Sequence, residues 1–406
     1  MQTSLPEEIL NTPQGQEADR ILRSCVHCGF CTATCPTYQL LGDELDGPRG
    51  RIYLIKQLLE GGRVTERTQR HLDRCLTCRA CETTCPSGVR YARLLDIGRQ
   101  QVAQRVGRPT GQRLLRWAIR KTVPYPGRFA LLLRPAQWLR PLLPESLRRR
   151  VPVSRSAGES VDPVHPRRML VLEGCAQSVA TPGTNTAAAR VLNRLGISLV
   201  SSPSAGCCGA VDLHMGAEDD GLGHVRRNID AWWPEIEAGA EAVVITASGC
   251  GAQVKEYGEL LGNDPEYAEK ARRVSEMARD LGEVLIAEDL STLAHEVKPE
   301  RVAVHCPCTL QHAQQLPDVV EQILERLGFD LADTRDKHLC CGSAGTYSIL
   351  QPEISSELRS NKLKALTIDS PDLIVTANVG CQLHLSAGSD LPVSHWIELL
   401  DRSLDR

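Results

Sequence analysis

The chain has 406 residues and a formal net charge of −3 at pH 7, so it is long enough for two or three domains with cores of their own. Hydrophobic residues make up 42% of it, and no apolar run approaches the roughly 18 residues that a membrane-spanning helix needs, which argues against an integral membrane protein. The 17 cysteines are many for a chain whose acidic, polar N-terminus lacks an apolar signal region, and they indicate metal or redox ligands rather than a disulfide framework.

Two cysteine motifs with identical spacing occur near the N-terminus. Residues 25–35 read CVHCGFCTATC, residues 75–85 read CLTCRACETTC, and a proline follows each. Both have the form C-x2-C-x2-C-x3-C-P, which bacterial two-cluster ferredoxins use. The first three thiolates can surround one cube, whereas the fourth lies too far along the chain and ligates the other cluster. The predicted ligands of two 4Fe–4S clusters are Cys25, Cys28, Cys31 and Cys85 for the first, and Cys75, Cys78, Cys81 and Cys35 for the second.

Zinc is the alternative occupant of these motifs, because CxxC pairs also suit a tetrahedral zinc ion. Each motif, however, supplies a third regularly spaced cysteine before its fourth, which favours iron–sulfur clusters. His27 lies between two predicted ligands, and we interpret it as a solvent-facing or supporting residue rather than as a ligand.

Helical patterns surround the two motifs. Residues 17–24 predict a short helix that leads into the first motif, and residues 42–50 predict a turn-rich acidic loop. Apolar residues between 52 and 59 recur at helical spacing, and a Gly-Gly pair follows them. We therefore expect a helical, ferredoxin-like two-cluster domain over residues 1–105, in which helices rather than a hairpin separate the motifs.

Residues 106–165 predict a basic, proline-rich linker. Between Arg113 and Arg150 there are ten basic residues and one acidic residue, Glu145. Tryptophan and leucine alternate with arginine there, which is typical of a helix lying on an anionic membrane. The alternative, a packed linker whose arginines snorkel or meet an acidic subunit, stays open. Charge alone does not indicate nucleic acid, and we expect no nucleic-acid partner.

The rest of the chain is an internal repeat with an offset of 131 to 133 residues. For example, GCCGA at 206–210 recurs as LCCGS at 339–343. Short apolar runs alternate with helical patterns in both copies, which predicts two homologous α/β domains with parallel sheets, over residues 166–290 and 298–406. The expected strands are 169–172, 197–200, 242–245, 302–304, 329–331 and 373–375.

Each repeat carries four cysteines in matching places, and 31 residues separate the first from the adjacent pair in both copies. Each set follows predicted strands, where the loops of α/β sheets gather ligand sites. The cysteines are interpreted as metal or cluster ligands; the alternative is that they are small buried hydrophobic residues. The candidates are Cys175, Cys207, Cys208 and Cys250 in the first repeat, and Cys308, Cys340, Cys341 and Cys381 in the second, where Cys306 and His384 are spare candidates. His305, His312, His338 and His384 are candidates to tune a centre through hydrogen bonds.

Taken together, these motifs resemble the iron–sulfur subunits of glycolate oxidase, anaerobic glycerol-3-phosphate dehydrogenase, lactate utilisation and heterodisulfide reductase. The glycolate oxidase iron–sulfur subunits are the most similar in local sequence. The resemblance covers nearly the whole chain apart from the basic linker. The segments that carry it are CVHCGFCTATCPTY at 25–38, GPRGRI at 47–52, DRCLTC at 73–78, ASGCGA at 247–252 and HCPCTLQH at 305–312.

The resemblance implies an α+β protein that conducts electrons and carries no catalytic residue for substrate. FAD-containing dehydrogenase subunits would oxidise glycolate to glyoxylate, and this chain would pass the electrons toward a quinone or another membrane carrier. It implies a heteromeric complex that is cytoplasmic and peripheral on the cytoplasmic membrane. Its cofactors would be two 4Fe–4S clusters and one or two further iron–sulfur centres in the Cys-Cys-Gly domains, with FAD only in the partners.

One departure separates the chain from the heterodisulfide reductase form of these domains, which ends in CxxC. Here Gln253 stands three residues after Cys250, and His384 stands three residues after Cys381. The missing thiolate argues against a noncubane cluster. The alternatives are an iron–sulfur subunit of a lactate-, glycerol-3-phosphate- or heterodisulfide-type oxidoreductase, and a zinc scaffold. No GxGxxG motif after a strand, no Walker A motif and no nucleophile–base pair points to another activity.

Overall fold

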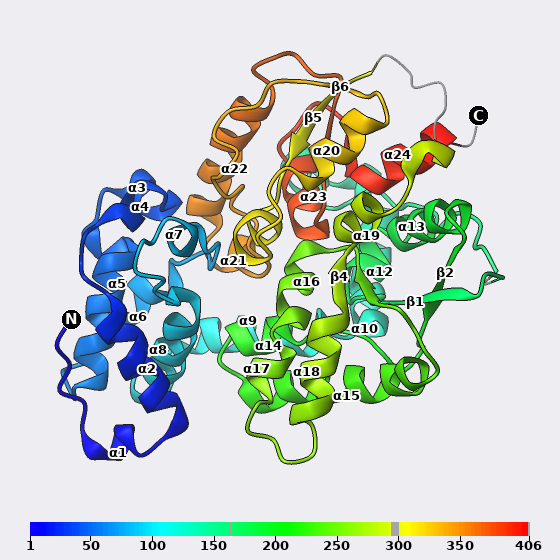
Figure 1. Ribbon diagram of the computed structural model, residues 1–406. Helices are drawn as coiled ribbons and strands as arrows, with labels where there is room; N and C mark the ends of the chain where they lie inside the picture. Colours follow the sequence, from blue (N-terminus) through cyan, green and yellow to red (C-terminus); the bar gives the residue numbers. More distant parts are fainter. Residues whose placement is uncertain (163, 294–299, 405–406) are drawn as a thin grey trace.

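The computed structural model describes residues 1–162, 164–293 and 300–404. Figure 1 places a helical N-terminal module on the left and two α/β units on the right. Helices α4 (Pro36–Leu41), α5 (Pro48–Leu59) and α6 (Glu66–Asp73) lie between the two cysteine motifs, as expected. The acidic loop predicted over 42–50 is shorter than expected, because a 3-10 turn and the first turn of α5 occupy part of it. The module contains α1 (Glu7–Leu10), α2 (Pro13–Ser24), α3 (Phe30–Ala33), α4 (Pro36–Leu41), η1 (Glu44–Asp46), α5 (Pro48–Leu59), α6 (Glu66–Asp73), α7 (Ala80–Thr83) and α8 (Tyr91–Arg105).

The core of the N-terminal module forms where α5 and α8 cross. Ile55, Leu94 and Leu95 are completely buried there. A Cβ atom on Gly98 would lie 2.7 Å from Ile55 Cγ1, so glycine permits the close approach of the two helices. The predicted apolar face of residues 52–59 is therefore confirmed as the inner face of α5.

The two α/β units each contain a four-stranded sheet whose strands are all parallel. The strand orders, β2-β1-β3-β4 and β6-β5-β7-β8, are equivalent, which confirms the internal repeat. The six predicted strands are confirmed. Strands β4 and β8 are not among the predicted ones, because each is only three residues long and has a polar residue at its centre. The strands are β1 (Arg167–Val171), β2 (Ile197–Ser201), β3 (Val243–Ile245), β4 (Ala278–Asp280), β5 (Arg301–His305), β6 (Asp330–Leu331), β7 (Leu373–Thr376) and β8 (Val393–His395).

Helices cover both sheets, and the order of elements is similar in the two repeats. The expected first residue of the second domain, 298, lies outside the described residues. The first repeat has α12 (Ala176–Ala180), α13 (Gly183–Arg194), α14 (Ala210–His214), α15 (Glu218–Glu237), α16 (Ser248–Lys255), α17 (Tyr257–Leu260), α18 (Ala268–Met277), α19 (Leu281–Ala287) and the 3-10 turn η3 (Leu290–Leu293). The second has the π-helical turn η4 (Thr309–Ala313), α20 (Val319–Arg326), α21 (Tyr347–Leu350), α22 (Pro352–Leu366), α23 (Val379–Ser386) and α24 (Trp396–Leu404).

One apolar core spans both repeats. It joins side chains of α13, such as Val191, to side chains of α20 and α24, such as Ile323 and Trp396. Polar contacts close the same junction, since the Ser248 amide donates to the Ala377 carbonyl at 3.0 Å. The two repeats therefore share one hydrophobic core rather than forming two independent domains.

The predicted linker is mostly helical and forms α9 (Thr110–Thr122), α10 (Pro126–Leu139), η2 (Arg140–Leu142) and α11 (Glu145–Arg148). Part of its positive charge is neutralised within the chain, because Arg116 lies 3.3 Å from Asp73 and Arg120 lies 2.7 Å from Asp212. Helix α10 has no buried residue. Among the described residues, no helix combines the length and the apolar character needed to cross a membrane.

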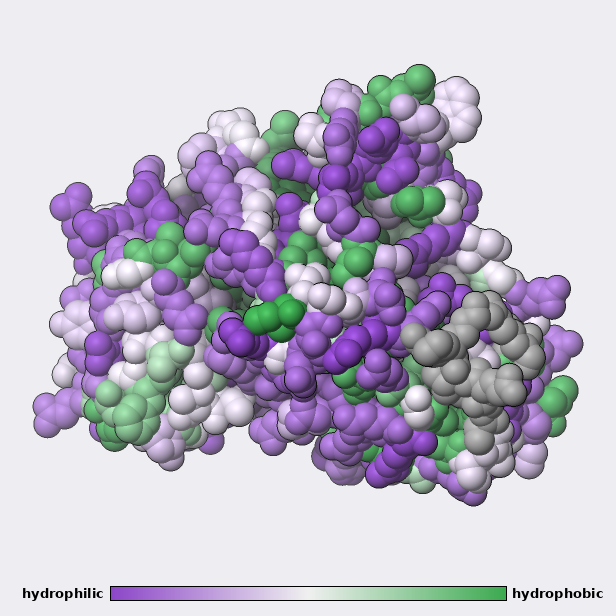
Figure 2. Space-filling view, turned by 90° about the horizontal axis from the view of Figure 1, so that it is seen from above, coloured by the Kyte–Doolittle hydropathy of each residue, from purple (hydrophilic) through white to green (hydrophobic). Residues whose placement is uncertain are grey.

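Figure 2 shows one face of the molecule, on which apolar side chains form small green patches between hydrophilic purple ones. Scattered apolar side chains of this kind are usual on a globular surface. The linker is different, because large exposed apolar side chains occur at close intervals along it. They are Leu114, Leu115, Trp117, Leu131, Leu132, Trp138, Leu139, Leu142 and Leu147.

A buried ionic network fixes the segment between the two cysteine motifs. Asp46 is completely buried. Its carboxylate oxygens lie 2.8 Å from a guanidinium nitrogen of Arg74 and 2.9 Å from Nδ1 of His71. Arg51, also completely buried, lies 3.5 Å from Asp46 and donates to the His71 carbonyl at 2.7 Å. The network ties α5 to the turn before it and to α6, which leads into the second motif.

Replacing Arg51 with Met should destabilise the protein by about 3 kcal/mol, because it removes a cation from a buried carboxylate. The matched control is Arg49→Met on the same helix, whose ion pair with Glu44 is half exposed and should contribute about 0–1 kcal/mol. Anaerobic thermal unfolding of both variants measures the difference. Equal losses from the two substitutions would contradict the importance of the buried network.

Candidate iron–sulfur sites

The first group of thiols combines three cysteines of the first motif with the last cysteine of the second. Cys25, Cys28, Cys31 and Cys85 line one small cavity. Burial, together with the nearby Cys25 and Cys85, raises the pKa of Cys31 to about 11. Thiols grouped in this way need a cation to hold them as thiolates.

The second group has the reciprocal composition. Cys35, Cys75 and Cys78 line a second cavity together with Cys81, which lies between the two groups and also lines the first cavity. Burial raises the pKa of Cys78 well above its usual value, and nearby thiols including Cys308 and Cys35 add to the effect. The structure thus brings the fourth cysteine of each motif to the cavity of the other, which is the arrangement that crossed ligation requires.

The backbone of the two motifs is wound in the same way. His27 and Thr77, at equivalent positions, have φ angles of 56° and 55°, and Gly29 and Arg79 have φ angles of 87° and 62°. Left-handed backbone is costly for residues other than glycine and marks a functional constraint. It turns amides inward, since the Thr77 N–H donates to Cys75 Sγ at 3.4 Å. Such hydrogen bonds to sulfur tune cluster potentials.

The two groups differ in their access to solvent. Cys28 is exposed, and its neighbours Val26 and Phe30 are 67% and 61% exposed. Cys78 and Cys81 are buried. The first group therefore lies at the surface, whereas the second lies inside the protein.

The four cysteines of the first repeat converge at the carboxyl ends of parallel strands, as predicted. Cys175 follows β1, Cys207 and Cys208 follow β2, and Cys250 lies on α16 directly after β3. A contact with Cys207, together with burial, raises the pKa of Cys175 well above its usual value. Cys208 in turn interacts with Cys250, so the four thiols form a continuous group.

The second repeat has an equivalent group. The Sγ atoms of Cys308 and Cys340 are 3.7 Å apart, and Cys341 interacts with both Cys340 and Cys381. The contact with Cys340 and burial raise the pKa of Cys308 well above its usual value. The structure therefore brings together all four candidate cysteines of each repeat.

Glycine after each cysteine pair is required by the turn. Gly209 and Gly342 have φ angles of 91° and 89°. A Cβ on Gly342 would lie 2.6 Å from the Ser355 carbonyl oxygen, closer than real Cβ contacts come. The Gly342 amide donates to Cys340 Sγ at 3.4 Å, and the Gly209 amide does the same for Cys207. The Cys-Cys-Gly motif is thus a turn that aims an amide at a thiol.

The two spare candidates of the second repeat do not join its thiols. Cys306 packs in the apolar core shared by the repeats. His384 Nε2 lies 3.2 Å from the Ser355 carbonyl oxygen, so its hydrogen bond goes to backbone. Their expected ligand role rested on proximity in sequence, which did not show the direction of each side chain.

The other candidate histidines have different places. His312 connects the second repeat to the N-terminal module, with Nδ1 3.1 Å from Thr83 Oγ1 and Nε2 2.9 Å from the His338 carbonyl oxygen. His305 lies at the end of β5, where a ring nitrogen and the sulfurs of Cys341 and Cys381 lie within 4.8 Å of one another. His305 is therefore the candidate histidine that shares a potential metal site with two thiols.

Lys362 is a site residue that the sequence did not reveal. It is 4% exposed, its ammonium group donates to the Asp336 carbonyl at 2.6 Å, and it lies near the thiols of the second repeat. Burial lowers its pKa, and Cys341 and Cys340 oppose that effect. A lysine on a helix is too common for the sequence to single it out.

The second thiol group of the N-terminal module packs directly against the second repeat. Leu76 and Cys78 share an apolar cluster with Cys340 and Leu358. The Tyr347 hydroxyl donates to the Arg74 carbonyl at 3.0 Å and closes the edge of this junction. Thiols of two domains thus meet inside the protein.

The first repeat meets the N-terminal module through charged residues instead. Arg79 pairs with Glu256, and the Gln100 amide donates to Glu218 at 2.7 Å. A polar cavity lies between the module and the first repeat, and in it Asp96 Oδ1 lies 3.5 Å from His214 Nδ1. The two repeats therefore contact the module in chemically different ways.

Comparisons with known proteins find two kinds of domain in the chain. The 4Fe-4S dicluster domain matches residues 21–89, and the cysteine-rich domain matches residues 169–255 and 302–386. The chain is 59% identical to the glycolate oxidase iron-sulfur subunit of Escherichia coli (strain K12), over 100% of both chains. The chain belongs to the glycolate oxidase iron–sulfur subunit family. Iron–sulfur cluster binding follows for its N-terminal domain.

More distant relatives match less of the chain or at lower identity. The probable glycolate oxidase iron-sulfur subunit of Bacillus subtilis (strain 168) is 33% identical over 90% of this chain and 89% of its own length. Lactate utilization protein A of Shouchella clausii (strain KSM-K16) is 26% identical over 56% of this chain and 95% of its own length. A hypothetical protein from Helicobacter pylori has a TM-score of 0.55 at 11% identity, covering 98% of this chain and 74% of that chain, which supports the fold alone.

Crossed ligation makes a specific prediction for Cys85. Cys85→Ser should alter the electron paramagnetic resonance signal of the cluster held by Cys25, Cys28 and Cys31, because Cys85 lines that cavity. Cys35→Ser is the matched variant and should alter the other signal. If Cys85→Ser instead gives the same spectrum as Cys75→Ser, each motif holds its own cluster and the crossing is wrong.

Proposed function

We propose that this chain is the iron–sulfur electron-transfer subunit of a heteromeric glycolate dehydrogenase (oxidase) complex. In this proposal, FAD-containing partner subunits oxidise glycolate to glyoxylate, and this chain passes the electrons toward a quinone or another membrane carrier. The observation that supports the substrate most strongly is the full-length 59% identity to a glycolate oxidase iron-sulfur subunit. The buried junction between thiols of two domains supports the electron-transfer role.

The donor sets fit iron–sulfur clusters, because each of the four groups offers four thiols. When bound, such clusters would carry out one-electron transfer, and the side chains would bind and orient them. Cys25, Cys28, Cys31 and Cys85 would hold the first cluster, and Cys75, Cys78, Cys81 and Cys35 the second. Amides such as that of Thr77 donate to the sulfurs and stabilise their negative charge.

The surface around the first thiol group is suited to a redox partner. Cys28 is exposed between the apolar side chains of Val26 and Phe30. Exposed apolar side chains that gather beside a functional group mark interaction sites. We therefore assign the docking of an FAD-containing subunit to this face.

A further iron–sulfur centre is proposed for the second repeat. Its four thiols lie beside the second group of the N-terminal module, through Cys78 and Cys340, whereas the first repeat meets the module through ion pairs. A centre held by Cys308, Cys340, Cys341 and Cys381 would extend the chain of redox sites away from the exposed end. A centre held by Cys175, Cys207, Cys208 and Cys250 would lie off that line.

The linker helices support a peripheral position on an anionic membrane. Leu131, Leu132 and Trp138 are 76%, 61% and 80% exposed, and arginines such as Arg134 are exposed beside them. Apolar side chains interleaved with cations bind the interface of an anionic bilayer. We infer from this composition that the linker holds the complex at the cytoplasmic membrane surface, where it could reach a quinone.

The isolated subunit should not oxidise glycolate or lactate with any dye, because the cofactors proposed for it include no hydride acceptor. Activity should appear when the FAD-containing subunits are added. In that complex, Cys28→Ser and Cys78→Ser should abolish electron transfer to quinone and leave the flavin reducible by glycolate. The measurement is stopped-flow absorbance of flavin and quinone. Substrate turnover by the subunit alone would refute the proposal.

Membrane binding should depend on exposed arginines of the linker and not on those already paired within the chain. A triple variant with Arg113→Gln, Arg134→Gln and Arg148→Gln should bind phosphatidylglycerol vesicles roughly 100-fold more weakly, since each cation contributes about 1 kcal/mol. The matched control carries Arg63→Gln, Arg67→Gln and Arg70→Gln, which are exposed on the N-terminal module. Flotation with vesicles measures both. Equal binding by the two triple variants would assign the linker to an acidic partner subunit instead.

A further inference from the structure

His305 has an unusual environment at the carboxyl end of β5. The side chain is 2% exposed, and its Nδ1 atom lies 2.9 Å from Thr376 Oγ1 on the neighbouring strand β7. Its Nε2 atom is buried and has no hydrogen-bond partner. A buried polar atom without a partner is costly and needs an explanation, such as an ion.

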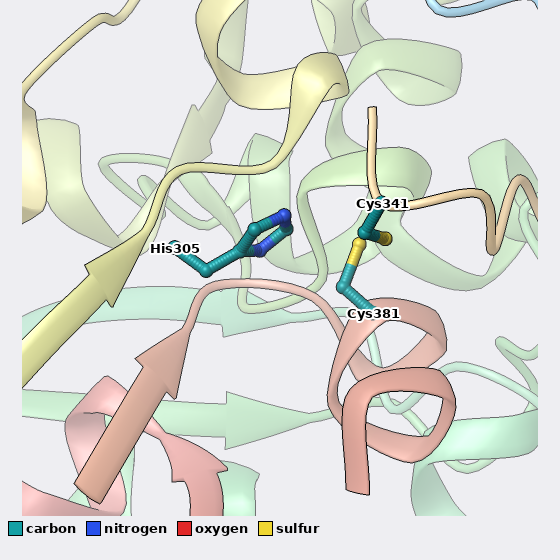
Figure 3. A group of neighbouring side chains, drawn as sticks. All are labelled: His305, Cys341 and Cys381. Carbon is teal, nitrogen blue, oxygen red and sulfur yellow. The ribbon is translucent and has the colours of Figure 1, made fainter. Parts of the chain in front are cut away.

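The side chains in front of the ring are thiols. Figure 3 shows His305 pointing toward Cys341 and Cys381, which come from the turn after β6 and from α23. A ring nitrogen of His305 and the two sulfurs lie within 4.8 Å of one another, and all three residues are buried. The Asn378 side-chain amide donates to Cys381 Sγ at 3.4 Å and fixes that thiol in place.

The two ring nitrogens of His305 have different surroundings, since Nδ1 lies beside the Thr376 hydroxyl and Nε2 has no hydrogen-bond partner. When Nδ1 donates its proton to Thr376 Oγ1, Nε2 carries a free lone pair directed away from β7. A histidine that donates from one nitrogen and ligates through the other is the usual arrangement in protein metal sites.

The first repeat provides a natural comparison. His305 stands three residues before Cys308, and Leu172 stands three residues before Cys175 in the equivalent position. Leu172 is 2% exposed and packs in an apolar cluster with Cys208. The thiols of the first repeat therefore have no imidazole at this position, although the strands and turns around them are equivalent.

We propose that His305 Nε2 is a ligand of the iron–sulfur centre in the second repeat, beside the thiolates of Cys341 and Cys381. The centre then has mixed imidazole and thiolate ligation, whereas any centre of the first repeat has thiolates alone. The inference rests on the proposed function to the extent that the second repeat holds iron. It explains both the orphaned nitrogen and the difference between the repeats.

The test uses the complete complex, purified anaerobically from cells grown with ¹⁴N- or ¹⁵N-histidine. Electron–nuclear double resonance should detect a directly bound nitrogen that changes with the isotope. Both the oxidised and the reduced forms are examined, because one state of any one-electron couple has an odd number of electrons. The coupling should disappear in His305→Leu, which copies the first repeat, and in His305→Gln, which keeps a polar side chain toward Thr376.

The control is His384→Leu, since His384 is close to the site but bonds to the Ser355 backbone. This variant should keep the nitrogen coupling. Signals of the two N-terminal clusters report that each variant is folded. Iron analysis separates the two levels of the proposal: about eight irons per chain means that the second repeat holds no cluster, which overturns that part of the proposed function. About twelve irons without a histidine coupling in either state overturns ligation by His305 alone.

Discussion

The structure depends on thiols brought together in groups of four, most of them buried. A lone buried thiol behaves as a small apolar side chain, but several thiols side by side cannot all ionise unless a cation compensates them. Burial and neighbouring thiols already raise the pKa values of Cys78, Cys308 and Cys341 well above their usual values. Metal binding at such a site releases protons and contributes directly to the stability of the fold. The left-handed turns at the motifs are the backbone cost of this arrangement.

The same α/β unit occurs twice, but its two copies meet the N-terminal module differently. The second repeat contributes Cys340 and Tyr347 to an apolar junction that contains Cys78. The first repeat contributes Glu256 and Glu218 to ion pairs and hydrogen bonds. Apolar contact between the two thiol groups excludes water from their junction. The charged contact orients the first repeat against the module. The two repeats therefore share one fold but differ in the chemistry of their contact with the N-terminal module.

The sequence was informative wherever spacing alone determines geometry. Cysteine spacing predicted which thiols meet, and apolar runs predicted six strands, because both patterns follow from short-range backbone geometry. The direction in which each side chain points was harder to predict from the sequence. His305 and Cys306 are adjacent at the end of β5, where successive side chains point to opposite faces, so one faces the thiols and the other enters the core. The linker charge was ambiguous for a related reason: only the fold reveals that Arg120 meets Asp212, 92 residues away.

Electrostatics around the second repeat favours the arrival of negative charge. Lys362 is buried near Cys340 and Cys341, where low dielectric strengthens its attraction for the thiolates of a bound centre. Burial lowers the pKa of Lys362, whereas the neighbouring thiolates raise it and so favour its charged form. A neutral imidazole from His305 would add a ligand without adding negative charge. At the other end, Cys28 is exposed to water beside Val26 and Phe30, where a partner can approach. If the second repeat holds a centre, the nearby Lys362 would favour an additional electron there, and electrons would move from the exposed site toward the buried one.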